Sequence, residues 1–236
     1  MFDVIAFDAD DTLWHTESQY AAAQEALKRL LADYAGPEQI ERTLLDVEIR
    51  NLQYYGYGIK GFALSLIEAA LDIGEDHIRG PDIRRLIDLA KEMLTAEVQL
   101  FEHAEEVVSR LAAAYPLMLV TKGDLLDQEL KIDRSGLKPY FRHVEIVSDK
   151  TPEIYAALLA KHHIDPARFL MIGNSLRSDV LPVVALGGWA VHIPYHITWA
   201  HEHVSPPAGD RNHYYELEHL GLLPALIERL SREEKS

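Results

Sequence analysis

Five short apolar segments constrain the fold of this 236-residue chain more than any other feature of its sequence. Each is four or five residues long, the length of a buried strand, and they occupy residues 3–7, 117–120, 143–147, 169–172 and 189–193. Beyond residue 100, helical patterns lie between them, near residues 102–114, 125–135, 152–162 and 179–186. Because strands that alternate with helices form a parallel sheet covered on both faces, we predict a doubly wound, Rossmann-like α/β core.

The stretch between the first two apolar segments has a different character, with hardly a strand candidate in it. Its helical patterns begin after Thr16 and continue near residues 37–54, 59–73 and 81–98, with glycines between them. Thr16, followed by Gln19, fits a capping box that opens the first of these helices. We therefore predict an α/β core domain of residues 1–15 and 100–236, interrupted by a helical cap domain of residues 16–99.

The composition narrows the possible partners. A formal net charge of −15 repels a nucleic-acid backbone, whose binding normally needs a stripe of Lys and Arg. No apolar run reaches the length of a membrane-spanning helix, and the N-terminus shows no targeting segment. Cysteine is absent, so no disulfide framework favours secretion. We expect no nucleic-acid polymer and no membrane as partners, and a cytoplasmic location.

Polar residues follow the apolar segments where each predicted strand ends. In chain order they are Asp8, Asp10 and Asp11, then Thr121, Lys122 and Gly123, then Asp149 and Lys150, and finally Asn174 and Asp179. Open parallel sheets bind ligands at this edge, so we expect these groups to face one site. Carboxylates that converge on one point repel each other unless a hard cation lies between them, and Mg²⁺ prefers oxygen ligands. The amides after the second strand lead into a helical pattern, which suits an anion.

At these positions the sequence resembles the haloacid dehalogenase (HAD) superfamily. The family's first motif, a strand followed by Asp-x-Asp-x-Thr, is present as Asp-Ala-Asp-Asp-Thr in residues 8–12. The second, a strand ending in Thr or Ser, is present in residues 119–123, the third is Lys150, and the fourth is Gly-Asn-Ser-Leu-Arg-Ser-Asp in residues 173–179. Four motifs in family order and spacing are far more specific than a lone Asp-x-Asp.

The resemblance implies a role for each matched residue. Asp8 would attack phosphorus and form an aspartyl-phosphate, and Asp10 would protonate the leaving oxygen and later activate water. The residues that would bind the phosphoryl oxygens are Thr121, Lys122, Gly123 and Lys150. Lys150 would also keep the nucleophile ionised.

The same resemblance implies a Mg²⁺ ion held by Asp8, by the backbone carbonyl of Asp10, and by Asn174 and Asp179 of the fourth motif. Most relatives have Asp where this chain has Asn174. An amide oxygen can ligate Mg²⁺ but brings no charge, so this departure weakens the expected metal affinity.

Position 10 separates branches of the family. Its dehalogenases and phosphonate-cleaving members lack an acid two residues after the nucleophile, so Asp10 favours a phosphatase of a small phosphorylated metabolite. Phosphomutases keep the same acid, and a phosphomutase is therefore one alternative. A non-catalytic binding or regulatory module is another, for which Asn174 is the only hint in the sequence.

An aromatic loop with one cation, Tyr-Tyr-Gly-Tyr-Gly-Ile-Lys-Gly-Phe in residues 54–62, lies between two helical patterns of the cap. By resemblance, helical inserts at this place close over the site and choose the leaving group, which makes the loop a candidate specificity element. The alternative is that its rings pack the core of the cap itself.

Overall fold

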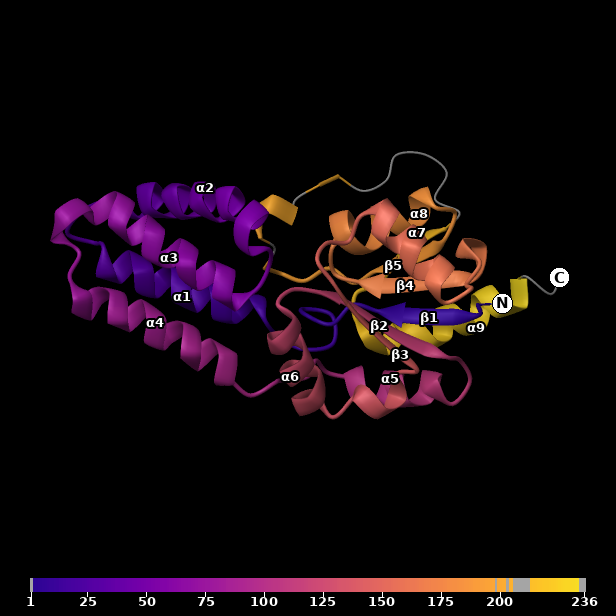
Figure 1. Cartoon of the computed structure of the whole chain (residues 1–236). Coiled ribbons are helices and arrows are strands. Elements are labelled where there is room, and N and C mark those ends of the chain that lie inside the picture. The colour runs from indigo at the N-terminus through magenta and orange to yellow at the C-terminus, as the bar shows by residue number, and fades with distance from the viewer. Residues whose placement is uncertain (1, 198, 203, 206–212, 234–236) are drawn as a thin grey trace. The chain divides into compact units, whose positions relative to one another are not determined.

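A computed structural model describes residues 2–197, 199–202, 204–205 and 213–233. Within these residues, six parallel strands form one sheet in the order β3-β2-β1-β4-β5-β6 (Figure 1). The strands are β1 (Val4–Phe7), β2 (Leu117–Lys122), β3 (His143–Val147), β4 (Phe169–Gly173), β5 (Trp189–His192) and β6 (Tyr214–Glu216). The chain runs outward from β1 to β3 and returns with β4 on the other side of β1. The predicted doubly wound α/β fold is confirmed, with its switch point between β1 and β4.

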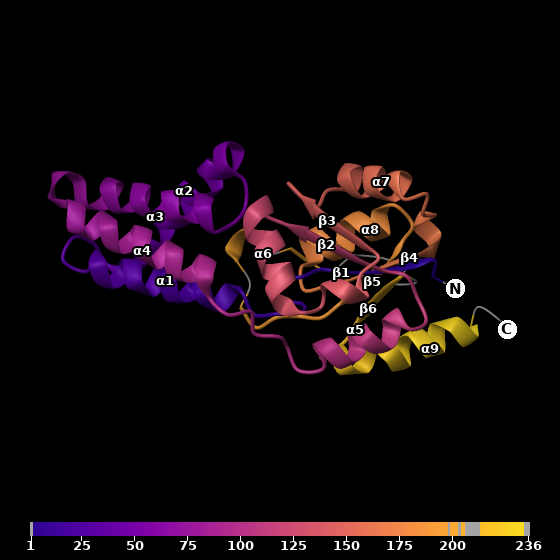
Figure 2. The same cartoon turned by 60° about the horizontal axis from the view of Figure 1, so that its bottom comes forward.

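Helices cover both faces of this sheet (Figures 1 and 2). They are α5 (Ala104–Ala112), α6 (Leu125–Ser135), α7 (Pro152–Lys161), α8 (Leu181–Ala185) and α9 (Leu223–Glu233). Side chains alternate between the faces along each strand, so Ile5 of β1 packs in a cluster with residues of α5 and α9. The next residue, Ala6, packs with residues of α7 and α8. Both strand residues are fully buried, which explains why these strands are almost continuously apolar in sequence.

One strand is longer than predicted, and one strand was not predicted. The strand β2 continues through Thr121 and Lys122, two residues beyond its apolar run, because both residues keep parallel pairing with β3. The strand β6 (Tyr214–Glu216) was not predicted at all. It is only three residues long and pairs with β5 at the edge of the sheet, so its sequence is too short to show an alternating pattern.

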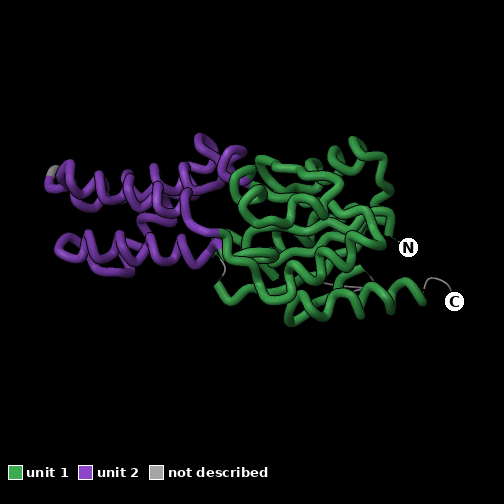
Figure 3. Tube along the Cα trace, turned by 90° about the horizontal axis from the view of Figure 1, so that it is seen from below, with its two compact units in different colours: residues 1–15, 98–122, 129–236 green, residues 16–97, 123–128 purple. Residues whose placement is uncertain are grey.

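The chain divides into two compact units, shown in different colours in Figure 3. The first, here called the α/β unit, consists of Met1–His15, Val98–Lys122 and Glu129–Ser236. The second, here called the helical unit, consists of Thr16–Glu97 and Gly123–Gln128. We predicted the short segment Gly123–Gln128 as part of the α/β core domain, but in the structure it groups with the helical unit.

The helical unit contains α1 (Glu17–Leu30), α2 (Pro37–Tyr55), α3 (Ile59–Gly74) and α4 (Gly80–Thr95). Their apolar faces form one buried cluster that includes Leu27, Leu44 and Leu66. The side chain of Thr16 lies at the N-cap position of α1 but makes no capping hydrogen bond, so the predicted capping box is wrong. With φ −137° and ψ −48°, its backbone lacks the extended conformation that brings a capping oxygen over the first turn.

The aromatic loop of residues 54–62 lies within the helical unit, as the end of α2, a short turn and the start of α3. Some of its rings pack in the core of the helical unit and others are exposed. Phe62 is buried in the core of this unit, whereas Tyr54 is 70% exposed. Lys60 donates to the carboxylate of Asp124 in the same unit, at 2.7 Å.

No helix among the residues that the structure describes is long and apolar enough to cross a membrane.

Candidate active site

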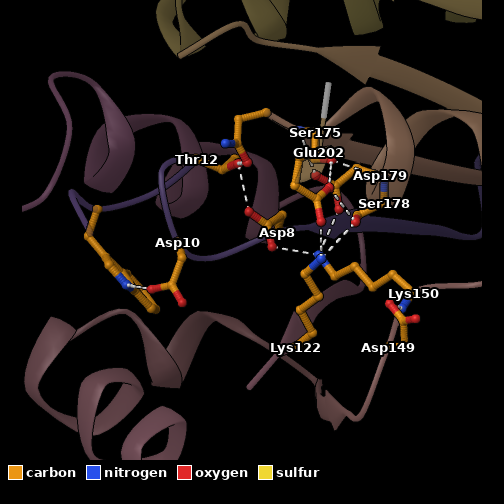
Figure 4. A network of polar contacts seen from close by, with 12 residues as sticks. Asp8, Asp10, Thr12, Lys122, Asp149, Lys150, Ser175, Ser178, Asp179 and Glu202 are labelled. Carbon is orange, nitrogen blue, oxygen red and sulfur yellow. Dashed lines mark hydrogen bonds and ion pairs between the residues drawn. The ribbon is translucent and has the colours of Figure 1, made fainter. Parts of the chain in front are cut away.

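Asp8 follows β1 at the carboxyl edge of the sheet, and its side chain is buried in a network of polar contacts (Figure 4). Its Oδ1 accepts a hydrogen bond from Nζ of Lys150 at 2.5 Å, and its Oδ2 accepts one from Oγ1 of Thr12 at 2.9 Å. Both carboxylate oxygens are therefore held by donors from separate segments of the chain. Such a carboxylate is fixed in orientation, as a nucleophile must be.

The Lys150 ammonium lies between two buried carboxylates. It donates to Asp8 at 2.5 Å and to Oδ1 of Asp179 at 2.6 Å, and its side chain is 2% exposed. The other oxygen of Asp179 accepts from the backbone N–H of Ser175 at 3.0 Å. The third and fourth sequence motifs thus meet the first motif through a single cation.

The position of the Asp179 side chain requires a glycine at Gly173, the last residue of β4. A Cβ atom at this position would lie only 2.1 Å from Oδ2 of Asp179. Only a glycine allows the Asp179 side chain to lie against the end of β4. Close packing therefore explains why the fourth motif begins with glycine.

The buried carboxylates of Asp8 and Asp179 and the ammonium of Lys150 together carry one excess negative charge. Burial raises the pKa of Asp8 to about 7, and the neighbouring Asp179 carboxylate raises it too, while the Lys150 ammonium opposes both. Burial by itself would lower the pKa of Lys150, but the two carboxylates raise it above its usual value. Lys150 therefore stays charged, and Asp8 is the group able to change protonation near neutral pH.

Thr12 belongs to the first motif but is not among the site residues that the sequence predicts. Besides its bond to Asp8, its hydroxyl lies 3.3 Å from Oδ1 of Asn174. Thr12 therefore joins the nucleophile candidate to the residue that departs from the family pattern. Its place as the last residue of the Asp-x-Asp-x-Thr motif was the signal that could have identified it.

Asp10 does not converge on Asp8. Figure 4 shows its carboxylate directed away from that of Asp8. Its Oδ1 accepts from the indole Nε1–H of Trp14 at 2.7 Å, and Nζ of Lys131 lies 2.8 Å from both of its oxygens. The two acids of the first motif, only two residues apart, therefore bind two different sets of donors.

The three predicted phosphate-binding residues after Val120 have different surroundings. Thr121 is 1% exposed at the end of β2, next to β1 in the sheet. The Lys122 ammonium donates to Oε1 of Glu202 at 2.5 Å and to Oγ of Ser178 at 2.9 Å. Gly123 has φ +145° and begins the segment that groups with the helical unit.

Glu202 is a residue that the sequence analysis missed. One of its oxygens accepts from Lys122, and the other accepts from the hydroxyls of Ser175 at 2.5 Å and Ser178 at 2.8 Å. Burial by itself would raise the pKa of Glu202, but these donors lower it to about 2. Nothing in the local sequence marks Glu202, because its partners lie 24 to 80 residues away.

This network predicts a pH-dependent contribution to stability. The pKa of Glu202 falls from 4.5 to about 2 on folding, so its contribution is present above pH 4.5 and is lost as the pH falls toward 2. We expect Glu202→Gln to lower the free energy of unfolding by about 2–3 kcal/mol at pH 7, and by much less near pH 3. Denaturant unfolding at the two pH values measures this difference.

The matched control is Glu228→Gln, whose side chain is 54% exposed and pairs with Arg110 at the surface. It is expected to change the free energy of unfolding by less than about 0.5 kcal/mol. An unfolding free energy of Glu202→Gln that differs from wild type equally at both pH values would contradict the assigned role of this carboxylate.

Few oxygen atoms in the described part of the chain lie together where they could hold a metal ion. Among the residues that the structure describes, no group of three or more His, Asp and Glu side chains is placed to hold a metal ion. Of the predicted ligands, Asp8 and Asn174 meet at Thr12, Asp179 binds Lys150, and the Asp10 side chain binds Lys131. The carboxylate and amide oxygens at Thr12 are the hard donors that Mg²⁺ prefers.

A family model of haloacid dehalogenase-like hydrolases matches residues 2–187, which include all of these contacts except those of Glu202. The chain belongs to this family. This hydrolase is similar to the crystal structure of a haloacid dehalogenase-like family hydrolase from Xanthomonas campestris, with 38% identity and a TM-score of 0.88. The alignment covers 98% of this chain and 93% of that one. No match to a curated protein was found.

Two more distant structures share the fold. A 2-haloacid dehalogenase from Pseudomonas syringae pv. Tomato DC3000 has 21% identity and a TM-score of 0.64, with 98% of this chain and 100% of that chain covered. A HAD phosphatase from Thermococcus onnurineus has 20% identity and a TM-score of 0.62, with 96% and 98% covered. The fold therefore accommodates both carbon–halogen and phosphoester chemistry, and the side chains of the site must discriminate between them.

Proposed function

We propose that this hydrolase is a Mg²⁺-dependent phosphatase of a small phosphorylated metabolite. The observation that carries the proposal is the pair Asp8 and Asp10, two acids that lie two residues apart and bind separate donors. A phosphoester needs a nucleophile on one side of phosphorus and a proton for the leaving oxygen on the other. Displacement of a halide needs no such proton, so a second acid favours phosphoesters over halogenated substrates.

In the proposed first step, a carboxylate oxygen of Asp8 forms a bond to phosphorus as the bond to the leaving oxygen breaks. The leaving oxygen takes the carboxyl proton of Asp10 and departs as an alcohol. In the second step Asp10 takes a proton from water, whose oxygen attacks phosphorus. The bond between phosphorus and the Asp8 oxygen breaks, inorganic phosphate is released, and Asp8 returns as a carboxylate and Asp10 in its protonated form.

Lys150 and Thr121 serve the phosphoryl group in this proposal. Lys150 has three N–H donors, of which two are directed to Asp8 and Asp179, and the third can reach a phosphoryl oxygen. The ammonium also holds Asp8 in place before attack. Thr121, buried at the end of β2, supplies a hydroxyl at the same edge of the sheet.

The oxygen donors at Thr12 fit Mg²⁺. We assign the carboxylate of Asp8, the amide oxygen of Asn174 and the backbone carbonyl of Asp10 as its ligands, with Asp179 holding Lys150 instead. When bound, Mg²⁺ supplies positive charge that offsets the phosphoryl oxygens and orients them. A divalent cation also offsets the negative charge that Asp8 and Asp179 hold in excess over Lys150.

The test is phosphate release from a panel of sugar, nucleotide and small-acid phosphates, with Mg²⁺ or with EDTA. Release that requires Mg²⁺ supports the proposal and begins to identify the substrate. Isomerised sugar phosphate without free phosphate would instead identify a phosphomutase. Chloride release from 2-chloropropionate, with no release from any phosphoester, would overturn the proposal in favour of a dehalogenase.

The amide at position 174 leads to a prediction about metal affinity. Asn174→Asp adds a carboxylate beside Asp8 and Thr12, and a charged ligand binds Mg²⁺ more tightly than an amide. We expect the Mg²⁺ concentration for half-maximal phosphate release to fall on the order of tenfold, about 1.4 kcal/mol. A Mg²⁺ titration of activity measures it, and an unchanged midpoint would mean that residue 174 is not a ligand.

A further inference from the structure

The second acid of the first motif is held by two donors outside the four motifs. Nζ of Lys131 is equidistant from the two carboxylate oxygens of Asp10, at 2.8 Å from each. The indole Nε1–H of Trp14 donates to Oδ1 at 2.7 Å. The contact is largely shielded from water, because the side chains of Lys131 and Asp10 are 13% and 24% exposed. Most ion pairs on the surface of this protein are far more exposed.

Both donors are anchored by packing. Trp14 is 1% exposed and lies in the apolar cluster under one face of the sheet. Ile132, the residue after Lys131 in α6, is 2% exposed in the same cluster. The backbone that carries Lys131 is therefore fixed relative to the loop after β1, and its ammonium reaches Asp10 from a defined position. A side chain held by three such contacts has one rotamer available.

The direction of Asp10 has a chemical consequence. In an in-line displacement the attacking and leaving oxygens lie on opposite sides of phosphorus, so the acid that protonates the leaving oxygen must stand away from the nucleophile. Figure 4 shows the Asp10 carboxylate turned away from Asp8 in this way. Without the donors, rotation about the Asp10 side-chain bonds would let its carboxylate turn toward Asp8 and the metal ligands.

We propose that Lys131, with Trp14, is a positioning residue for proton transfer: it holds the Asp10 carboxyl group on the leaving-group side of the phosphoryl group. Lys131 touches neither phosphorus nor the nucleophile, and its effect passes through Asp10. This inference rests on the proposed phosphatase activity. There, Asp10 is protonated when the ester binds, gives its proton to the leaving oxygen as the phosphorus–oxygen bond breaks, and is left as the carboxylate that Lys131 and Trp14 bind.

The kinetic test compares two esters of similar shape, phenyl phosphate and 4-nitrophenyl phosphate, with Mg²⁺ present. Phenolate is the poorer leaving group and depends more on protonation. Lys131→Met is expected to lower kcat for phenyl phosphate roughly ten- to a hundredfold, part of what a general acid supplies, and kcat for 4-nitrophenyl phosphate by less than about threefold. Lys131→Arg, which keeps the positive charge, is expected to restore most of the loss.

Two controls separate positioning from general damage. Lys138→Met removes a lysine that is 57% exposed and pairs with Asp133, and it should leave both rates unchanged. In an Asp10→Asn background, Lys131→Met should not change the ratio of the two rates any further, because both changes act on one group. Equal losses on the two esters, or a further change of that ratio in the Asp10→Asn background, would overturn the proposal.

A measurement without substrate keeps this inference separate from the proposed function. The chain has three tryptophans, and the indole N–H signal of Trp14 in a ¹H–¹⁵N spectrum can be assigned with Trp14→Phe. Lys131→Met should shift that signal, since the acceptor Asp10 changes position, and Lys131→Arg should restore it. An unshifted signal would contradict the role of Lys131. Failure of the wild type to release phosphate from these esters and from the metabolite panel, with a shifted signal, would count against the phosphatase and not against the contact.

Discussion

Phosphate release by Asp8→Asn is expected to fall at least about 10³-fold below wild type, while the protein stays folded. An amide cannot form the aspartyl-phosphate, so the covalent route is lost outright. Folding should survive because Asn keeps the volume of Asp and its oxygen can still accept from Lys150 or Thr12. The change also removes the excess negative charge of the buried trio. Phosphate release and thermal unfolding, measured on the same preparation, test both parts.

The matched control is Asp133→Asn, because Asp133 lies on α6 with its side chain 55% exposed and pairs only with a surface lysine in the described contacts. It should retain full activity. If a phosphorylated form can be trapped in the wild type and not in Asp8→Asn, the phosphoryl group of the intermediate is on Asp8. Appreciable turnover by Asp8→Asn would place the nucleophile on another residue.

Lys150→Met is expected to have the second large effect, on stability as well as on activity. It leaves Asp8 and Asp179 buried side by side without the cation that both contact. Breaking a buried pair by removing one partner typically costs about 3–5 kcal/mol of unfolding free energy. Activity should be lost too, because in the proposed mechanism the same ammonium orients the nucleophile and binds a phosphoryl oxygen.

The pH dependence of this loss has a definite sign. Burial already raises the pKa of Asp8 and Lys150 opposes that rise, so without Lys150 the folded-state pKa of Asp8 lies still further above its unfolded value. The contribution of Asp8 to stability is then fully present at low pH, where its carboxyl group is protonated, and is lost as the pH rises through the raised pKa. We therefore expect Lys150→Met to be nearest wild type in unfolding free energy around pH 4 and furthest from it around pH 8.

A second substitution tests the cause. Asp8→Asn combined with Lys150→Met should recover part of the lost stability, because only one carboxylate then remains in the buried site. Lys161→Met, at a lysine that is 61% exposed, should change the unfolding free energy by less than about 1 kcal/mol. A destabilisation by Lys150→Met that is the same at every pH would mean that lost packing, and not charge, is its origin.

The family and its core elements could be predicted because the signals are local. Five strands appear as short apolar runs, and four of them are buried on both faces. Asp8, Lys150 and Asp179 follow such runs at the motif spacing. The strand β6 gave no comparable signal, because three residues at a sheet edge carry too little pattern. Thr12 stood inside a motif, yet its double contact with Asp8 and Asn174 depends on how the loop after β1 folds back.

The sequence by itself determined which residue types stand at the ends of the strands and hence the family of this hydrolase, because strand periodicity and motif spacing are properties of neighbouring residues. Only the tertiary structure decided which donors each of these residues meets. Asp10 binds Lys131 across 121 residues and Lys122 binds Glu202 across 80, and these pairings exist only because packing of the sheet and its helices brings the segments together. Charge pairing over such separations follows from the fold and leaves no local pattern to read.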